Sequence, residues 1–470
     1  MSFYSATFVL FFAGVVALFY VASEGKRVPV LLAASALFYI SFNPKYIFVL
    51  LALIAVDYVA GILIERAESP VVRTAWLAVS ITMNLSFMAA FKYLPDVTGR
   101  SLGAIPIGLS FHTFQAMAYT IEVYRGRQAA ERSFPVFALY VMFFPQIAAG
   151  PIERPQDLLP QFRKPHPFEY SNVVAGLQLM VWGLIQKYIV AERLSQIVDR
   201  SYNGSSFSGP LTAVAAVLFS FQIFCDFSGY SDIALGAAQV LGFRLTRNFN
   251  APFHADSMAE YWKRWHISLS TWMRDYVFFP LCGHRPRMPR ICASIVLVFL
   301  ANGLWHGARW NYLISGLLHG TYRVTELLAA RAFSRRGWTL NAIWILPARI
   351  ARTILVFSLM TFAFIFFRGA NLSQSLKVVV RLFSGWAHVF HPAALSAEII
   401  RSGMTTVGFL RATELPLVVE AVLILRSGGM LRPRIAALSP VYRWSLYYAA
   451  AAALLLLGGQ IDQPFIYFGF

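Results

Sequence analysis

The run ICASIVLVFLANGLWHGARW, residues 291–310, decides the fold class of this 470-residue chain. It is apolar over nearly the length of about 20 residues that one membrane span requires. Near its end, however, it carries the imidazole of His306, which stands between two tryptophans. An ionisable group in a membrane helix costs on the order of 2.5–3.5 kcal/mol. We therefore expect this histidine to serve a function in that place.

Apolar runs of this kind recur along nearly the whole chain. The sequence is 58% hydrophobic and only 13% charged, and its mean hydropathy is +0.58. Several runs are too short for a full crossing, which is typical of re-entrant helices. The sequence therefore predicts an all-α fold, a polytopic membrane helix bundle of about 10–13 helices including re-entrant and interfacial ones, and a single domain over residues 1–470.

Basic residues outnumber acidic ones and lie in the short loops between apolar runs. Lys and Arg number 40 against 22 Asp and Glu, which gives a formal charge of +18. This is the positive-inside pattern of membrane proteins, so we expect anionic membrane lipids as partners and no nucleic acid. Lys26 and Arg27 follow the first apolar run, which predicts a retained first span with Met1 outside the cytoplasm.

The segment 244–290 is too polar to cross a membrane and mixes aromatic with basic residues. Such a mixture is typical of helices that lie in the headgroup layer, with rings at the boundary and cations toward phosphate. Lys263, Arg264 and Arg274 are its candidates for binding an anionic donor substrate. A simple interfacial anchor is the alternative.

The segment 291–330 is predicted to form two helices that enter from the cytoplasm and return to it. In one continuous helix His306 and His319 would lie roughly 140° and about 20 Å apart, so they would not share a proton. Gly307 and the polar residues after it favour a helix break just after His306. Asn302 lies one turn before His306 on the same face. We interpret these three residues as a catalytic group around a histidine base; the alternative is a structural histidine that caps a re-entrant turn.

Further polar side chains occur in apolar sequence. Asp226 and Asp232 flank Gly229, which permits a helix break. Two acids at membrane depth suit a cation site, a proton relay or a tunnel wall, and a purely structural role in bonding exposed backbone ends is the alternative. The remaining polar candidates, interpreted as structural or tunnel-lining, are His112, His266 and Asp275.

The patterns of common soluble enzymes and of metal sites are absent from the sequence. Its three cysteines have no CxxC pairing, so they predict neither a disulfide framework nor a zinc site. The sequence has no nucleophile elbow, P-loop, dinucleotide fingerprint or HExxH motif. We therefore expect no metal, and chemistry that rests on histidine as a base.

Five stretches in order, over residues 105–320, resemble the membrane-bound O-acyltransferase family and mark the catalytic core of the chain. They are PIGLSFHTFQAMAYTIEVYRG, FFPQIAAGPIERPQDLLPQF, FQIFCDFSGYSDIALG with GFRLTRNFNAPF, YWKRWHISLSTWMRDYVFFPL and GLWHGARWNYLISGLLHG. The resemblance is greatest to the branch of the family that acetylates exported polysaccharides such as alginate.

This resemblance implies a bundle around a central funnel or tunnel, with His306 as the family histidine and His319 as the second one. It implies transfer of an acetyl group from a cytosolic thioester, with acetyl-CoA as the donor and no tightly bound cofactor. The acetyl group would cross the bacterial inner membrane to an exopolysaccharide acceptor, with a periplasmic acetyltransferase or another polysaccharide-modifying protein as partner. Relatives carry Trp-Gly where this chain has Ser315 and Gly316, a departure that would alter the acyl pocket.

The tail, residues 460–470, ends in the letters FIYFGF. It resembles the C-terminal ending of the same acyl-transfer group, which implies Tyr467 as an acyl carrier; an aromatic interfacial anchor is the alternative. Two rival functions stay open for the whole chain. One is a transporter for a polysaccharide or lipid, and the other is acylation of a cell-wall polymer, a lipid or a protein.

Overall fold

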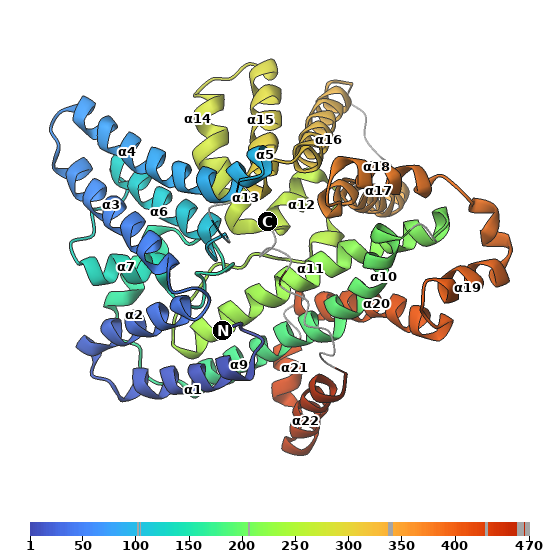
Figure 1. The fold of residues 1–470 in the computed structure, drawn as a ribbon, viewed down its shortest axis with the longest axis horizontal. Coiled ribbons are helices and arrows are strands. Elements are labelled where there is room, and N and C mark those ends of the chain that lie inside the picture. Colours follow the sequence, from blue (N-terminus) through green and yellow to red (C-terminus); the bar gives the residue numbers. More distant parts are fainter. Residues whose placement is uncertain are drawn as a thin grey trace. The chain divides into compact units, whose positions relative to one another are not determined.

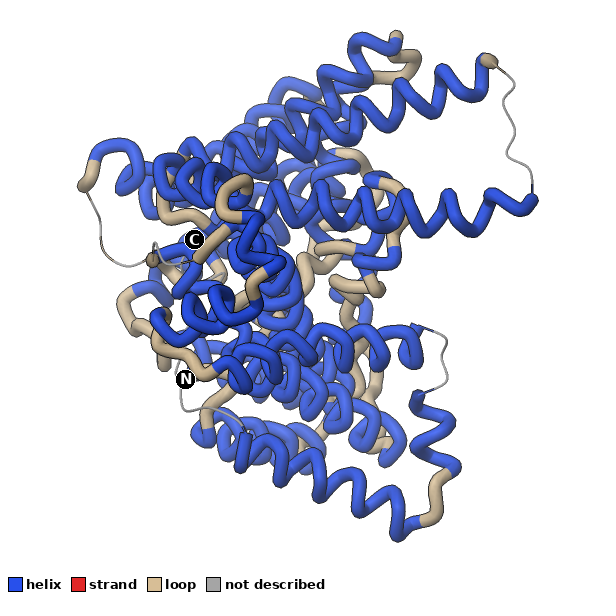
Figure 2. Tube along the Cα trace, turned by 90° about the vertical axis from the view of Figure 1, so that its right-hand side faces the viewer, coloured by secondary structure: helices blue, strands red, loops and turns tan. Residues whose placement is uncertain are grey.

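The computed structural model describes residues 1–100, 103, 105–204, 207–336, 342–427, 431–457 and 465. All regular elements within these residues are helical, and they include no strand (Figure 2). Those long and apolar enough to cross a membrane are Tyr46–Arg66, Pro70–Thr98, Tyr170–Asn203, Gly209–Val240, Met288–His306 and Ile343–Arg368. The predicted all-α, multi-pass membrane fold is thus confirmed.

The chain forms two compact units, and helix α11 (Gly209–Val240) contributes to both. Among the described residues, unit 1 comprises Met1–Leu184 and Gly229–Arg247. Unit 2 comprises Ile185–Ser228 and Asn248–Ile466. The single membrane domain expected from the sequence stays a prediction.

Unit 1 is built from the N-terminal helices drawn in blue to green in Figure 1. They are α1 (Ala6–Val21), α2 (Glu24–Ile40), α3 (Tyr46–Arg66), α4 (Pro70–Met88), η1 (Ala89–Tyr93), α5 (Leu94–Thr98), α6 (Leu109–Tyr124), α7 (Phe134–Met142), α8 (Pro155–Leu158), η2 (Leu159–Arg163) and α9 (Tyr170–Leu184).

A buried carboxylate joins three helices of unit 1. Asp57 of α3 accepts hydrogen bonds from Ser80 Oγ at 2.5 Å and from Asn84 Nδ2 at 2.9 Å, both on α4. Ser80 Oγ also lies 2.9 Å from Thr120 Oγ1 of α6. Polar side chains between membrane helices stabilise their association in this way.

Glycines bring α9 into contact with the end of α11 in unit 1. A Cβ atom on Gly176 would lie 2.6 Å from the carbonyl oxygen of Gly236, and one on Gly183 would lie 2.5 Å from that of Gly229. The two pairs are seven residues apart on each helix, so the antiparallel backbones touch at successive positions. The helix break that Gly229 would permit does not occur: α11 continues through this residue, whose missing side chain makes room for α9.

Unit 2 contains the remaining helices. They are η3 (Ile185–Ala191), α10 (Glu192–Asn203), η4 (Pro252–His254), α12 (Met258–Arg264), α13 (Ile267–Met273), η5 (Arg274–Phe278), α14 (Phe279–Cys282), α15 (Met288–His306), α16 (Trp310–Arg335), α17 (Ala342–Arg368), α18 (Leu372–Leu382), η6 (Trp386–Phe390), α19 (Pro392–Arg401), α20 (Thr406–Ser427), α21 (Leu431–Ala437) and α22 (Pro440–Leu457).

Helices α15 and α16 form the predicted hairpin and lie beside one another in Figure 1. A Cβ atom on Gly303 would lie 2.5 Å from the Tyr312 carbonyl oxygen, and one on Gly316 would lie 2.3 Å from that of Phe299. Small residues on both helices thus allow their backbones to meet. The helix break expected after His306 is confirmed, because α15 ends at this residue and α16 begins at Trp310.

Candidate functional site

His306 lies at the turn of the hairpin, in unit 2, and its side chain is buried. Its ring centroid lies 4.7 Å from that of Trp305 and 4.8 Å from that of Phe367 on α17, both nearly perpendicular to it. Tyr312 of α16 lies farther away, at 6.4 Å. Residues of three helices therefore hold this imidazole in an aromatic enclosure.

His319 occupies a second aromatic enclosure, two turns along α16 from Tyr312. Its ring lies 5.1 Å from Trp262 of α12 and 6.4 Å from Phe364 of α17. Phe364 in turn lies 6.4 Å from Phe367, which contacts His306. The two histidines are therefore linked through this phenylalanine pair rather than by contact. The Nδ1 atom of His319 is buried and has no hydrogen-bond partner in the described part of the chain.

Asn302 is buried one turn before His306 on α15. Its Oδ1 atom is enclosed and accepts no hydrogen bond from the residues that the structure describes. Its side chain therefore does not orient the histidine through a direct bond. The buried oxygen is thus left without a partner among the described residues, one turn from His306.

Asn311 fixes the turn that carries His306. Its Nδ2 atom donates to the carbonyl oxygens of Phe366 at 3.2 Å and Gly369 at 2.7 Å. Ser315 Oγ donates to the Ala363 carbonyl oxygen at 3.2 Å. Phe366 and Gly369 lie in the last turn of α17 or just after it, where backbone acceptors lack helical partners. Ala363 lies earlier in the same helix. From the sequence, Asn311 indicated only the helix break after His306. Its role in fixing the turn could not be predicted, because its hydrogen-bond acceptors lie more than fifty residues away in the chain.

His266 stands between α12 and α13 in a left-handed conformation, with φ 43° and ψ 54°. Its buried ring lies 4.7 Å from Phe227 and 5.9 Å from Trp305, the neighbour of His306. Burial lowers the pKa of His266 to about 3, so the ring is neutral at physiological pH. A non-glycine residue in this conformation costs of order 1–3 kcal/mol and is typical of functional sites.

Polar side chains of α16 and α17 attach the segment 244–290 to unit 2. Glu326 of α16 accepts hydrogen bonds from the backbone N–H groups of Met258 at 2.9 Å and Ala259 at 3.2 Å, which begin α12. Arg352 of α17 pairs with Asp256 at 2.9 Å. The buried side chains of this segment include Tyr261, Trp265, His266 and Leu269, so part of it belongs to the interior of unit 2.

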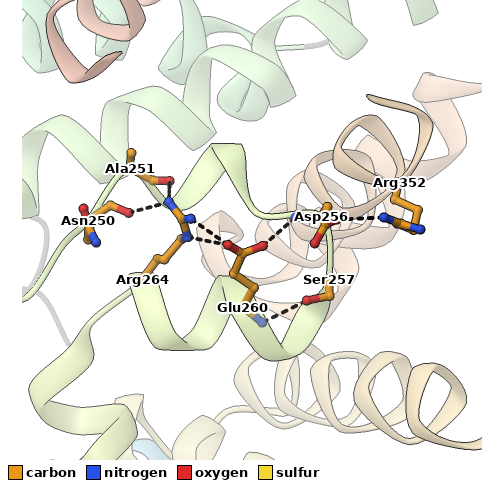
Figure 3. A network of polar contacts seen from close by, with 7 residues as sticks. All are labelled: Asn250, Ala251, Asp256, Ser257, Glu260, Arg264 and Arg352. Carbon is orange, nitrogen blue, oxygen red and sulfur yellow. Dashed lines mark hydrogen bonds and ion pairs between the residues drawn. The ribbon is translucent and has the colours of Figure 1, made fainter. Parts of the chain in front are cut away.

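Arg264, one predicted donor-binding residue, is already engaged within this segment (Figure 3). Its guanidinium bonds the Glu260 carboxylate at 2.6 Å and also donates to two backbone carbonyls, those of Asn250 and Ala251. Glu260 also accepts from the backbone N–H of Asp256 at 3.0 Å. The Glu260–Arg264 spacing of four residues was the sequence signal for this pair.

The other two donor-binding candidates differ in their surroundings. Arg274 pairs with Asp275 at 2.7 Å and lies over the Phe279 ring. Lys263 has an exposed side chain. Of the three cations, Lys263 is thus the one whose charge no described carboxylate neutralises by a salt bridge.

Asp226 takes part in an ion pair that the sequence did not reveal. Its Oδ1 atom lies 2.7 Å from Nζ of Lys187, and the side chains are 1% and 3% exposed. Lys187 lies in the π-helical element η3, in the middle of a long apolar run. Single lysines in such runs are a general signal for a buried partner. Asp232, also buried, belongs to unit 1 and is not part of this pair.

The last two predicted site residues are His112 and Tyr467. His112 is buried on α6 of unit 1, and neither ring nitrogen has a hydrogen-bond partner in the described part; this agrees with a packing histidine. Tyr467 lies outside the described residues. Phe465, two positions earlier, is buried and packs 5.9 Å from Phe227, the ring that contacts His266. Within the described residues, no group of three His, Cys, Asp or Glu side chains is placed to hold a metal ion.

Comparison with known proteins agrees with this site. The sequence model of the membrane-bound O-acyltransferase family matches residues 109–368, a range that includes both histidines of the hairpin. The chain is 33% identical to the probable alginate O-acetylase of Azotobacter vinelandii, over 82% of this chain and 78% of that protein. It is 30% identical to the peptidoglycan O-acetyltransferase of Helicobacter pylori, over 69% and 67%. It is 28% identical to the teichoic acid D-alanyltransferase of Streptococcus thermophilus, over 53% and 62%. The chain therefore belongs to the membrane-bound O-acyltransferase family and is a multi-pass membrane O-acyltransferase.

Proposed function

We propose that this enzyme transfers an acetyl group from cytosolic acetyl-CoA, across the bacterial inner membrane, to a hydroxyl group of an exported polysaccharide such as alginate. The observation that carries the proposal is the buried imidazole of His306 at the hairpin turn, inside the matched region. The alginate acceptor is supported by the relatives with that printed function over most of the chain. The N-terminus would face the periplasm.

His306 acts as the general base in this proposal. A neutral ring nitrogen accepts the proton of the acceptor hydroxyl while the oxygen attacks the thioester carbonyl carbon. The C–S bond then breaks, and the thiolate takes the proton from the imidazolium, so that the products are the acetyl ester and free CoA. Such a base contributes typically 10²–10⁴-fold to the rate.

Asn302 and His319 support the same step. The Asn302 amide would donate to the oxyanion that forms at the thioester carbonyl, because its side chain makes no hydrogen bond to His306 and lies one turn away. His319 would bind the acyl donor through its unpartnered Nδ1 atom. Lys263, with its exposed charge, is the candidate for the phosphates of CoA.

Tyr467 is a proposed intermediate acceptor, and a periplasmic acetyltransferase would then pass the group on. The described residue Phe465, two positions before Tyr467, contacts Phe227, which in turn contacts His266, and these contacts support the proposal. Membership of an acyltransferase family removes the support for a transporter. Relatives named for peptidoglycan and teichoic acid keep other acceptors open.

The test uses purified protein in lipid vesicles with radiolabelled acetyl-CoA, an alginate oligosaccharide and the periplasmic acetyltransferase that would complete the transfer. Release of free CoA together with labelled oligosaccharide is the expected result. His306→Ala is expected to abolish both signals at an unchanged protein level. Persistent acetylation by this variant would refute the role of His306, and CoA release only with a cell-wall polymer would refute the alginate acceptor.

A further inference from the structure

Helix α18 and the turn η6 carry apolar side chains that the described residues leave exposed. Leu376, Val380 and Phe383 lie on one face at the helical spacing, and Val380 and Phe383 are 70% and 75% exposed. Trp386 and Phe390 of η6 continue this surface, at 51% and 82% exposed. An exposed apolar surface of this kind marks an interaction site. We call these five residues the α18 surface.

The opposite side of α18 is fixed to the protein by polar and buried residues. Gln374 Nε2 donates to the Tyr202 carbonyl oxygen at 3.0 Å and to Asn203 Oδ1 at 3.1 Å, at the end of α10. Ser375 and Val378 are buried. Arg381 bonds the Gly204 carbonyl oxygen. The helix is therefore held in one rotational position, with its apolar side outward.

The position of α18 along the chain indicates what covers this surface. Helix α17 is long and apolar enough to cross a membrane and ends at Arg368. Helix α18 begins at Leu372, and the three intervening residues extend at most about 11 Å. Helix α18 thus starts close to the end of a membrane span, at the boundary between the hydrocarbon and the water. Exposed Lys377 lies at its edge, where a cation reaches lipid phosphate.

The same linker holds the turn that follows His306. The carbonyl oxygen of Gly369 accepts from Asn311 Nδ2 at 2.7 Å, and that of Ala370 accepts from Arg309 Nη1 at 3.3 Å. The ends of α15 and α17 therefore lie at the same level, and the hairpin turn adjoins the start of α18.

We propose that the α18 surface binds the lipid layer at the membrane boundary and so holds the turn beside His306 at that depth. The leaflet is the one reached by the C-terminal ends of α15 and α17. Trp386 and Phe390 suit this place, because aromatic residues are enriched at the level of the headgroups. The surface is thus a lipid contact rather than a site for a second protein.

The test measures the surroundings of single spin labels in lipid nanodiscs. In a variant without native cysteines, labels replace Val380 or Phe383, with Lys377 at the edge as the matched control and Trp310 as the marker of the hairpin turn. Labels at 380 and 383 are expected to collide more with oxygen than with a water-soluble nickel chelate, with the opposite order at 377. Position 310 is expected at the same depth as 383.

Two outcomes would overturn the proposal. Collision with the nickel chelate at 380 and 383 would place the surface in water, and protection from both reagents would mean that protein covers it. If the cysteine-free variant does not fold, Trp386→Phe gives a second measurement in the native background. Quenching by brominated lipid is then expected to fall relative to the wild type, and unchanged quenching would equally refute the lipid contact.

Discussion

The unbonded amide of Asn302 leads to the first prediction. Because its Oδ1 atom has no partner in the described part of the chain, Asn302→Ala is expected to leave the melting temperature almost unchanged. If the amide stabilises the oxyanion, kcat should fall by about 10²–10³-fold. Steady-state kinetics and thermal unfolding of the same purified sample check both statements. A lower melting temperature with an unchanged kcat would assign Asn302 to packing.

His266 permits a test that separates its ring from its backbone. His266→Ala and His266→Gly both remove the ring that packs against Trp305, so both are expected to lower turnover. Glycine adopts φ 43° more readily than alanine, so the glycine variant should be more stable by about 1 kcal/mol. Thermal unfolding of the two variants decides this, and equal stability would argue against strain at this position.

The turn after His306 could be predicted from the sequence, because a glycine follows the imidazole at the end of an apolar run. The catalytic role of His306 stays a prediction. The ion pair of Lys187 with Asp226 could not be predicted from the sequence, because the partners are 39 residues apart in the chain and come from different helices. Arg264 was interpreted as a donor ligand although Glu260, one turn earlier, was visible as a partner.

At the scale of elements, the ion pair between η3 and α11 is the clearest test of what a buried charge does. Lys187→Met or Asp226→Leu alone leaves one charge buried, which is expected to cost about 3–5 kcal/mol. The double variant removes both charges and is expected to be close to the wild type in stability. Membrane protein levels and unfolding in detergent measure all three. Additive losses in the double variant would show that the pair itself stabilises the fold.

The hairpin of α15 and α16 depends on glycines in its interface. In Gly316→Ala the new Cβ atom would lie 2.3 Å from the Phe299 carbonyl oxygen, so the helices must separate. The expected loss is about 1–3 kcal/mol, together with lower activity because His306 ends the partner helix. Gly14→Ala is the matched control, since no atom lies within 4 Å of its Cβ position. Equal effects of the two changes on unfolding would contradict the packing argument.

Helix ends were predicted well where an apolar run stops at a helix-breaking residue. They were predicted poorly where a glycine can either end a helix or make room for a neighbouring one. Gly307 ends a helix, whereas Gly229 lies within α11 and accommodates α9. Sequence alone does not separate these cases, because both glycines stand next to polar residues in apolar surroundings. The difference is made by a neighbouring helix, which only the tertiary structure supplies.

For the whole molecule, the charge pattern makes a prediction about sidedness. The open end of the α15–α16 hairpin carries the exposed cations Arg335 and Arg336. By the positive-inside rule, this end should face the cytoplasm. His306 ends α15, whose 19 residues begin at Met288, so the helix is about 28 Å long at 1.5 Å per residue. This length matches the hydrocarbon thickness. We therefore expect donor and acceptor to reach the enzyme from opposite faces.

Vesicles that contain the acceptor oligosaccharide and the periplasmic acetyltransferase, with acetyl-CoA added only outside, test this arrangement. Acetylated oligosaccharide should accumulate in the lumen, and the active fraction of the protein should equal the fraction that external trypsin cuts at Arg335 or Arg336. The trypsin sites and the donor would then lie on one face, and the acceptor on the other. Acetylation that requires donor and acceptor in the same compartment would contradict transfer across the membrane, while leaving the chain an O-acyltransferase that works on one face.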